Sequence, residues 1–122
     1  NRSPTHDHWL SAAVGRTGFT LNCMLVKTES KVECYISLPG GEEKSNAAFH
    51  ALLQRKSEIE AAFGDSLDWQ ELPGKLGCRI CKEFPGGWKS AEVDWGAMQD
   101  RLLDGLIRLE AALRKPIQEL RL

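Results

Sequence analysis

The sequence predicts an α+β fold, in which a four-stranded antiparallel sheet made of two hairpins carries two helices on one face in the order ββαββα. Three observations support this fold class. Apolar and polar residues alternate in 19–27 and 31–38, which is the period of a strand with one buried face. Apolar residues recur at steps of three and four in 48–63 and 95–113, as in an amphipathic helix. A second pair of short alternating runs lies between these two helical segments.

The first hairpin consists of two alternating runs joined by residues 28–30, a connection short enough to place the strands antiparallel. The residues expected on its buried face are Phe19, Leu21, Cys23, Leu25, Val32, Cys34, Ile36 and Leu38. The pairing register stays open, and with it the geometry of Cys23 and Cys34. Residues 9–14 are mildly apolar and are expected to form an edge strand or to pack loosely. Residues 1–8 are polar and are expected to form a disordered tail.

The helices have recognisable ends. Ser45 or Asn46 can cap the first helix through a side-chain oxygen, and Gly64 stands where a left-handed residue closes a helix. Pro116 is expected to stop or kink the last helix, because proline has no backbone N–H to donate. The buried stripe predicted for the last helix is Trp95, Met98, Leu102, Leu106, Leu109 and Leu113.

The second hairpin is predicted from the runs 67–72 and 78–84, which a Pro-Gly turn signal separates. Glu29 is expected in the turn of the first hairpin. Trp69 alternates with polar neighbours in the first of these later runs, so we expect its side chain to pack in the core.

The size and composition indicate one α+β domain over residues 9–122. The formal net charge of -1 argues against strong nonspecific binding to nucleic acid, which needs a concentrated positive surface. The sequence has neither an apolar run long enough to span a bilayer nor an N-terminal secretory signal, so we expect a cytoplasmic protein with free thiols and no membrane contact. The chain opens without Met, and we expect it to be the C-terminal domain of a longer protein.

Two clusters resemble metal sites. Cys78 and Cys81 form a C-x-x-C pair, but residues three apart on a strand point to opposite faces. We therefore expect buried free thiols, with a zinc site that also uses Cys23 and Cys34 as the alternative. The second cluster, residues 6–8, reads His-Asp-His and lies in the predicted tail, where ligands are not held in fixed geometry. No metal and no cofactor are predicted.

Two further patterns resemble catalytic or phosphate-binding motifs. Segments 40–45 and 86–90 are Gly-rich and end in Lys-Ser, but both lack the Gly that a phosphate loop requires directly before Lys-Ser. Glu29 and Lys31 form the E-x-K element of a restriction-type nuclease, with Asp7 upstream. A turn and a tail do not supply the rigidity that such a metal site needs. No catalytic residue is predicted, and this chain is not expected to be an enzyme.

The candidate contact surface is formed by Arg79, Lys82, Trp88 and Lys89. Trp88 lies in a Gly-rich loop and is the aromatic residue most expected to be exposed, with three basic residues near it in the sequence. Exposed aromatic and basic side chains together suit contact with single-stranded nucleic acid. A solvated rim is the alternative interpretation of the same residues.

One pattern runs through the chain and ends with a helix carrying an early tryptophan, Trp95. It consists of Phe49, Leu52, Lys56, Ile59, Glu60, Phe63, Gly64, Leu67, Trp69, Leu72, Arg79 and Ile80. In this pattern the chain resembles, over about residues 9–113, an uncharacterised bacterial and archaeal domain family. The family usually places this domain C-terminal to a restriction-endonuclease-like nuclease domain (PD-D/E-x-K type), and assigns it no catalytic residues.

The resemblance implies a non-catalytic accessory domain of a nuclease-like protein. Such a domain would contact nucleic acid, with DNA as a possible partner, or would position the N-terminal nuclease-like domain of the same chain. The alternative is a protein-interaction or dimerisation module that forms a homodimer and has no nucleic-acid role. The near-neutral charge and the long apolar last helix favour this alternative.

Overall fold

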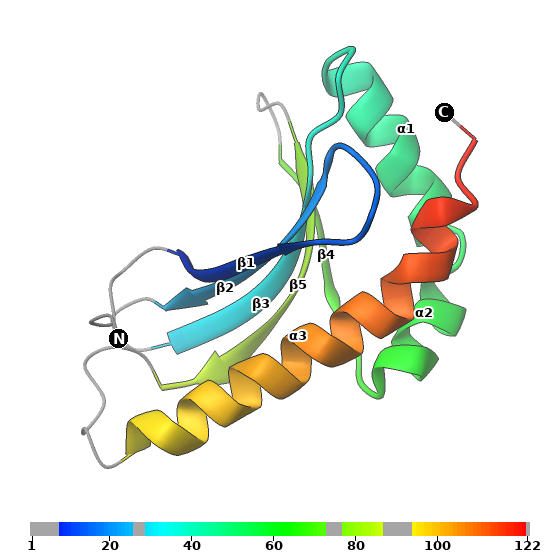
Figure 1. The fold of residues 1–122 in the computed structure, drawn as a ribbon. Coiled ribbons are helices and arrows are strands. Elements are labelled where there is room, and N and C mark those ends of the chain that lie inside the picture. Colours follow the sequence, from blue (N-terminus) through cyan, green and yellow to red (C-terminus); the bar gives the residue numbers. More distant parts are fainter. Residues whose placement is uncertain (1–7, 26–28, 73–76, 87–93, 122) are drawn as a thin grey trace.

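The computed structural model describes residues 8–25, 29–72, 77–86 and 94–121 (Figure 1). These residues form an α+β fold with an antiparallel sheet, which confirms the predicted class. The order is βββααββα, so both the predicted order and the predicted number of helices need correction. The elements are β1 (His8–Ala13), β2 (Phe19–Leu25), β3 (Glu29–Ile36), α1 (Glu42–Leu53), α2 (Lys56–Phe63), β4 (Asp68–Glu71), β5 (Cys78–Pro85) and α3 (Trp95–Gln118).

The described part of the sheet has five strands in the order β1-β2-β3-β5-β4, and every neighbouring pair is antiparallel. β2–β3 and β4–β5 are the two predicted hairpins, and the β3–β5 pairing joins them. β1 adds an edge strand beside β2. Of the two alternatives predicted for residues 9–14, an edge strand or loose packing, the structure shows the edge strand. The register places Cys23 opposite Val32 and Cys34 opposite Leu21, so the two cysteines are not direct cross-strand partners. Glu29 begins β3 and does not lie in a turn, contrary to the prediction.

The predicted first helix is divided into α1 and α2 by a break at Gln54 and Arg55. Arg55 binds Glu58 in the next turn and also Glu119 beyond α3, at 2.7 and 2.9 Å. The Arg55–Glu119 contact joins the helix break to the distant C-terminal end of α3.

Neither predicted capping residue caps α1, because the helix begins at Glu42, after Gly41. The Ser45 hydroxyl accepts a hydrogen bond from the Leu38 N–H at 2.8 Å, and Asn46 accepts one from the Cys78 thiol. Gly64 closes α2 with a left-handed φ of 100°, as predicted.

α3 continues past Pro116 to Gln118, so the predicted stop at the proline is wrong. Pro116 lies in the last turn of the helix, where only one intrahelical hydrogen bond is lost. Arg16, from the loop between β1 and β2, donates to the Ile117 and Leu120 carbonyls at 2.7 and 2.9 Å. These bonds satisfy carbonyls at the helix end and fix the C-terminal segment to this domain.

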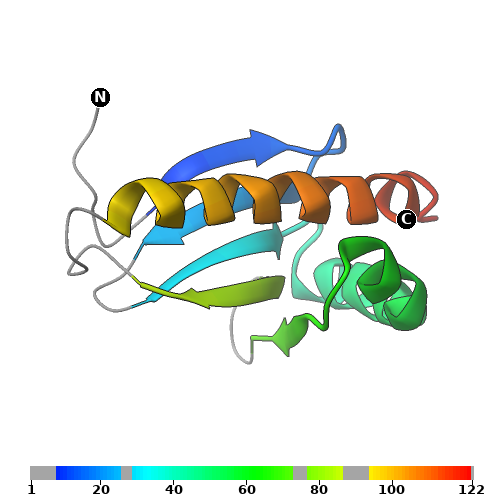
Figure 2. The ribbon, with the colours of Figure 1, turned by 90° about the horizontal axis from the view of Figure 1, so that it is seen from below.

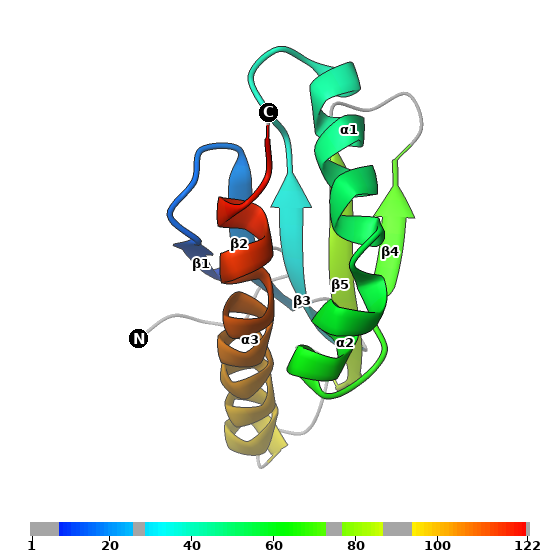
Figure 3. The same ribbon diagram turned by 90° about the vertical axis from the view of Figure 1, so that its right-hand side faces the viewer.

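The three described helices lie on one face of the sheet (Figure 3). No described helix lies over the other face, which we call the open face. α3 runs across the sheet beside the α1–α2 pair (Figure 2) and packs on α2 and on strands β3 and β2. The alternation along β3 follows from this arrangement. Val32, Cys34 and Ile36 are fully buried towards the helices, whereas Glu33 and Tyr35 belong to the open face.

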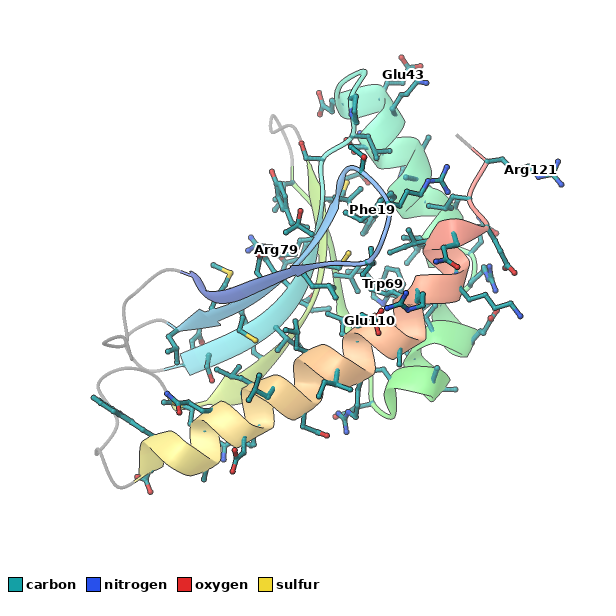
Figure 4. All side chains as sticks on the ribbon, viewed as in Figure 1. Phe19, Glu43, Trp69, Arg79, Glu110 and Arg121 are labelled. Carbon is teal, nitrogen blue, oxygen red and sulfur yellow. The ribbon has the colours of Figure 1, made fainter. Side chains whose placement is uncertain are left out.

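Trp69 packs against the core, as predicted, between the sheet and the helices (Figure 4). Its ring is tilted against that of Phe49, with centroids 6.1 Å apart. The indole N–H donates to Glu60 Oε2 at 3.0 Å, and the Leu67 N–H donates to the same oxygen at 2.9 Å. The hydrogen bond from Leu67 is the main reason that the pKa of Glu60 lies below its ordinary value. Glu60 therefore connects α2 to β4.

Candidate functional site

The structure does not bring Arg79 and Lys82 together. Both lie on β5, but a spacing of three residues places them on opposite faces of the sheet. Arg79 points away from the helices (Figure 4) and contacts Glu33. Lys82 binds Asp65 at 2.9 Å and is the main cause of the lowered pKa of that carboxyl group. The other two predicted contact residues, Trp88 and Lys89, lie outside the described residues.

The open face carries a polar cluster of three residues, which we call the Glu33 cluster: the buried Asn22 on β2, the buried Glu33 on β3 and the partly exposed Arg79 on β5. Asn22 Nδ2 donates to Glu33 Oε2 at 2.8 Å, and Arg79 Nη1 lies 3.4 Å from Glu33 Oε1. Glu33 is only 4% exposed and Asn22 only 5%. Burial of a carboxylate is costly unless hydrogen-bond donors surround it, and these two residues supply such donors.

A hollow of about 200 Å³ lies over this cluster on the open face. Its lining residues are Asn22, Met24, Glu33, Tyr35, Leu72 and Arg79. Apolar atoms dominate its walls, whereas the Glu33 cluster supplies its polar groups. The arrangement suits a ligand that is flat and apolar on its faces and polar along one edge.

Gly77 fixes the position of the Tyr35 ring beside this hollow. A Cβ atom added at Gly77 would lie 2.7 Å from atoms of that ring and 2.5 Å from the Ile36 carbonyl oxygen. Only glycine therefore leaves room for the aromatic side chain to lie against the neighbouring strand.

The alternation of the sequence predicts an outward position for Glu33 and Tyr35 and indicates no role for them. The available signal was the alternation itself, which places Asn22 and Glu33 on the polar side of β2 and β3. Arg79 joins them only because β5 pairs with β3, and this pairing is not encoded in either hairpin alone.

The four cysteines are buried free thiols, as predicted. Burial raises the pKa of Cys23 and Cys81 to about 11 and that of Cys34 to about 12. Cys78 pairs in register with Ile36 and faces the helices, whereas Cys81 pairs with Glu33 on the open face. Within the described ranges, no three His, Cys, Asp or Glu side chains are close enough to hold a metal ion. Two residues of the His-Asp-His cluster, and Asp7 of the nuclease-like pattern, fall outside those ranges.

The outer face of α3 is a second candidate surface. Five exposed residues recur on it at steps of three, four, four and three: Asp100, Leu103, Ile107, Ala111 and Arg114, here called the α3 strip. Ile107 is 66% exposed and Leu103 39% exposed, and these two are the large apolar side chains that are exposed among the described residues. A hollow of about 180 Å³ lies beside Ile107, and Leu21, Leu106 and Glu110 complete its lining.

The described residues form an α+β domain with these two surface hollows and no described group of metal ligands. The chain belongs to the family described as a domain of unknown function (DUF4268), whose model matches residues 1–117. No curated protein and no solved structure matches the chain. Of the helices described, none combines the length and the apolar character needed to cross a membrane.

Proposed function

We propose that this domain is a non-catalytic accessory module of a nuclease-like protein, and that it positions its neighbouring domain by pairing with a second copy of itself. The nuclease-like neighbour follows from the resemblance of the sequence. The observation that carries the pairing is the α3 strip, because exposed apolar side chains at helical spacing are typical of a helix that contacts another protein.

The spacing of the α3 strip is symmetric about Ile107. Asp100 lies seven residues before Ile107 and Arg114 lies seven residues after it, so all three share one side of the helix. If two α3 helices pair antiparallel around a two-fold axis at Ile107, each Asp100 faces an Arg114 of the other copy. Leu103 then faces Ala111, and the opposite ends of the two helix dipoles lie together. The sequence of the strip therefore complements itself.

Ion pairing of basic side chains favours a protein partner over a nucleic-acid backbone. Arg55, Arg79 and Lys82 each contact a carboxylate in the described structure. A surface that binds phosphates holds many cations available for that contact, and the net charge of -1 supplies no excess. We expect no gel shift of double-stranded DNA at moderate salt.

Sedimentation velocity over roughly 10 µM to 1 mM protein tests the pairing, because two helices bury an area at the low end for a stable dimer. The sedimentation coefficient of the wild type should rise with concentration. Asp100→Arg and Arg114→Asp should each weaken association by about tenfold or more, because like charges then face each other. The double variant should restore association, because the opposite charges are exchanged.

Glu43→Arg is the matched control, because Glu43 is exposed on α1 and lies away from the α3 strip (Figure 4). It should leave association unchanged, and circular dichroism should show that every variant is folded. A wild type that remains monomeric over the whole range contradicts the proposal. A double variant as weak as its single parents excludes the antiparallel arrangement.

A further inference from the structure

The hydrogen bonding of the Glu33 cluster is incomplete. A carboxylate has about four lone-pair positions. Glu33 accepts one short hydrogen bond from Asn22 and one long contact of 3.4 Å from Arg79. The Arg79 Nε–H is buried and has no hydrogen-bond partner among the described residues. The hollow on the open face is therefore lined by a carboxylate with spare acceptor capacity and by an arginine whose hydrogen bonding is incomplete.

The walls of this hollow add a second requirement on the ligand. Met24, Leu72 and the ring of Tyr35 line it with apolar and aromatic surface. A planar heterocycle meets both requirements, because its faces are apolar and its edge carries donors and acceptors. An aromatic side chain such as Tyr35 provides a surface on which such a ring can stack.

We propose that this hollow binds a guanine base through its Watson–Crick edge. Along that edge guanine presents two neighbouring donors, the N2 amino group and N1–H, followed by the acceptor O6. Glu33 accepts from the two donors, and Arg79 donates to O6. The inference is independent of the proposed pairing along α3, which lies on the other side of the sheet.

Other ligands fit these groups less well. Adenine offers one amino group and a ring acceptor on the same edge, so Glu33 would receive only one donor. An arginine side chain from a peptide has donors but no acceptor, which leaves Arg79 unsatisfied and brings two cations together. A phosphate group would approach the Glu33 carboxylate, whose charge repels it.

Guanine reaches such a site either as a free nucleotide or within a single strand, where bases can leave the stack and expose this edge. Titration of the folded protein with GMP, IMP and AMP, followed by amide chemical shifts in NMR spectra, tests the shared chemistry. IMP lacks only the N2 amino group. We expect GMP to bind at least about tenfold more tightly than IMP or AMP, because each comparison removes a hydrogen bond to a charged group.

Two ten-nucleotide strands distinguish the sources: one of thymine only and one with a single central guanine. Guanine-dependent binding of the strand that is tighter than GMP binding assigns the site to single-stranded nucleic acid. Binding of GMP that the strand does not improve assigns it to a free nucleotide. Both results support guanine recognition.

Glu33→Gln replaces one acceptor oxygen with an amino donor and should remove the preference for GMP over IMP. Glu83→Gln is the matched control, because Glu83 lies on β5 outside the lining of the hollow, and it should keep that preference. If Glu33→Gln does not fold, Arg79→Gln provides the same test through loss of the O6 contact. The inference is overturned by equal binding of the three nucleotides, by no GMP binding at millimolar concentration, or by stronger binding of an arginine peptide than of GMP.

Discussion

The two faces of the sheet exclude water by different means. The helices cover one face, and the other is the open face. Val32 on β3 faces the helices and is fully buried in an apolar core. Glu33, the next residue on β3, faces the opposite side of the sheet, which no described helix covers (Figure 3), yet it is only 4% exposed. Side chains from the neighbouring strands, among them Asn22 and Arg79, surround its carboxylate.

This difference supports our proposal that the open face binds a ligand, whereas the covered face supplies stability. Burial of apolar surface stabilises the fold by roughly 25 cal/mol per Å². Burial of a carboxylate costs several kcal/mol before its partners offset that cost, and apolar residues at the same place are often as stable or more so. We therefore propose recognition, rather than folding, as the role of the polar cluster beneath the hollow.

The largest expected effect belongs to the covered face. Ile80 is fully buried on β5, opposite Cys34 on one neighbouring strand and Trp69 on the other. Ile80→Ala should lower the free energy of unfolding by about 2–5 kcal/mol, because it removes buried methyl groups and leaves a cavity. Urea denaturation followed by tryptophan fluorescence measures the loss. A loss below about 1 kcal/mol would mean that the covered face does not carry the stability assigned to it.

On the open face, Glu33→Ala should cost about 2–3 kcal/mol, because it leaves the Asn22 amide and the Arg79 guanidinium without their acceptor. The cost stays below that of an enclosed ion pair, since about a quarter of the Arg79 side chain reaches solvent. Replacement of all three residues by Leu should recover most of the lost stability. Urea denaturation of the single and triple variants decides this. A triple variant weaker than Glu33→Ala would show that the cluster is needed for folding.

The hairpins and the fold class could be predicted because alternation and turn residues are local signals. The division of the predicted first helix could not, since Arg55 at the break binds Glu119, 64 residues away. Residue propensities near the break contain no information about that partner. The continuation of α3 beyond Pro116 also depends on a residue far away in the sequence, because Arg16 donates hydrogen bonds to the carbonyls at the helix end.

The candidate site could be predicted from the sequence only in part. Arg79 and Lys82 were grouped because they are close in sequence, yet the rule that separates Cys78 from Cys81 on a strand also separates these two. That part of the geometry was predictable. The burial of Glu33 was not, because it depends on which strand pairs with the second edge of β3. Half of the predicted contact surface, Trp88 and Lys89, lies outside the described residues.

Alkaline pH should affect thiols on both faces alike. Burial raises the pKa of Cys34, on the covered face, to about 12 and that of Cys81, on the open face, to about 11, from an ordinary value near 9. As pH rises, the unfolded chain therefore loses these protons before the folded protein does. The contribution of each thiol to the free energy of unfolding is full below about pH 9 and falls as pH rises towards the pKa of that thiol in the folded protein. Each thiol contributes a slope of about 1.4 kcal/mol per pH unit in that window.

Urea denaturation at several pH values between 8 and 10.5 measures this slope, and Cys34→Ala and Cys81→Ala should each reduce it. A slope reduced only by Cys34→Ala would show that the open face admits water to Cys81. That result would sharpen the contrast between the faces.

The smallest expected effect is at Gly105, where α3 crosses the covered face. A Cβ atom there would lie 3.1 Å from the Phe84 ring and 3.4 Å from Val32 Cγ1. Alanine favours a helix by up to about 1 kcal/mol over glycine, but the half-buried Phe84 ring has to shift by a few tenths of an ångström. Gly105→Ala should therefore change stability by less than about 0.5 kcal/mol. Gly96→Ala, with no neighbouring atom within 4 Å, should stabilise the protein by up to about 1 kcal/mol. Melting temperatures of the two variants test this, and a clear loss at Gly105 would mean that the ring of Phe84 is held firmly between helix and sheet.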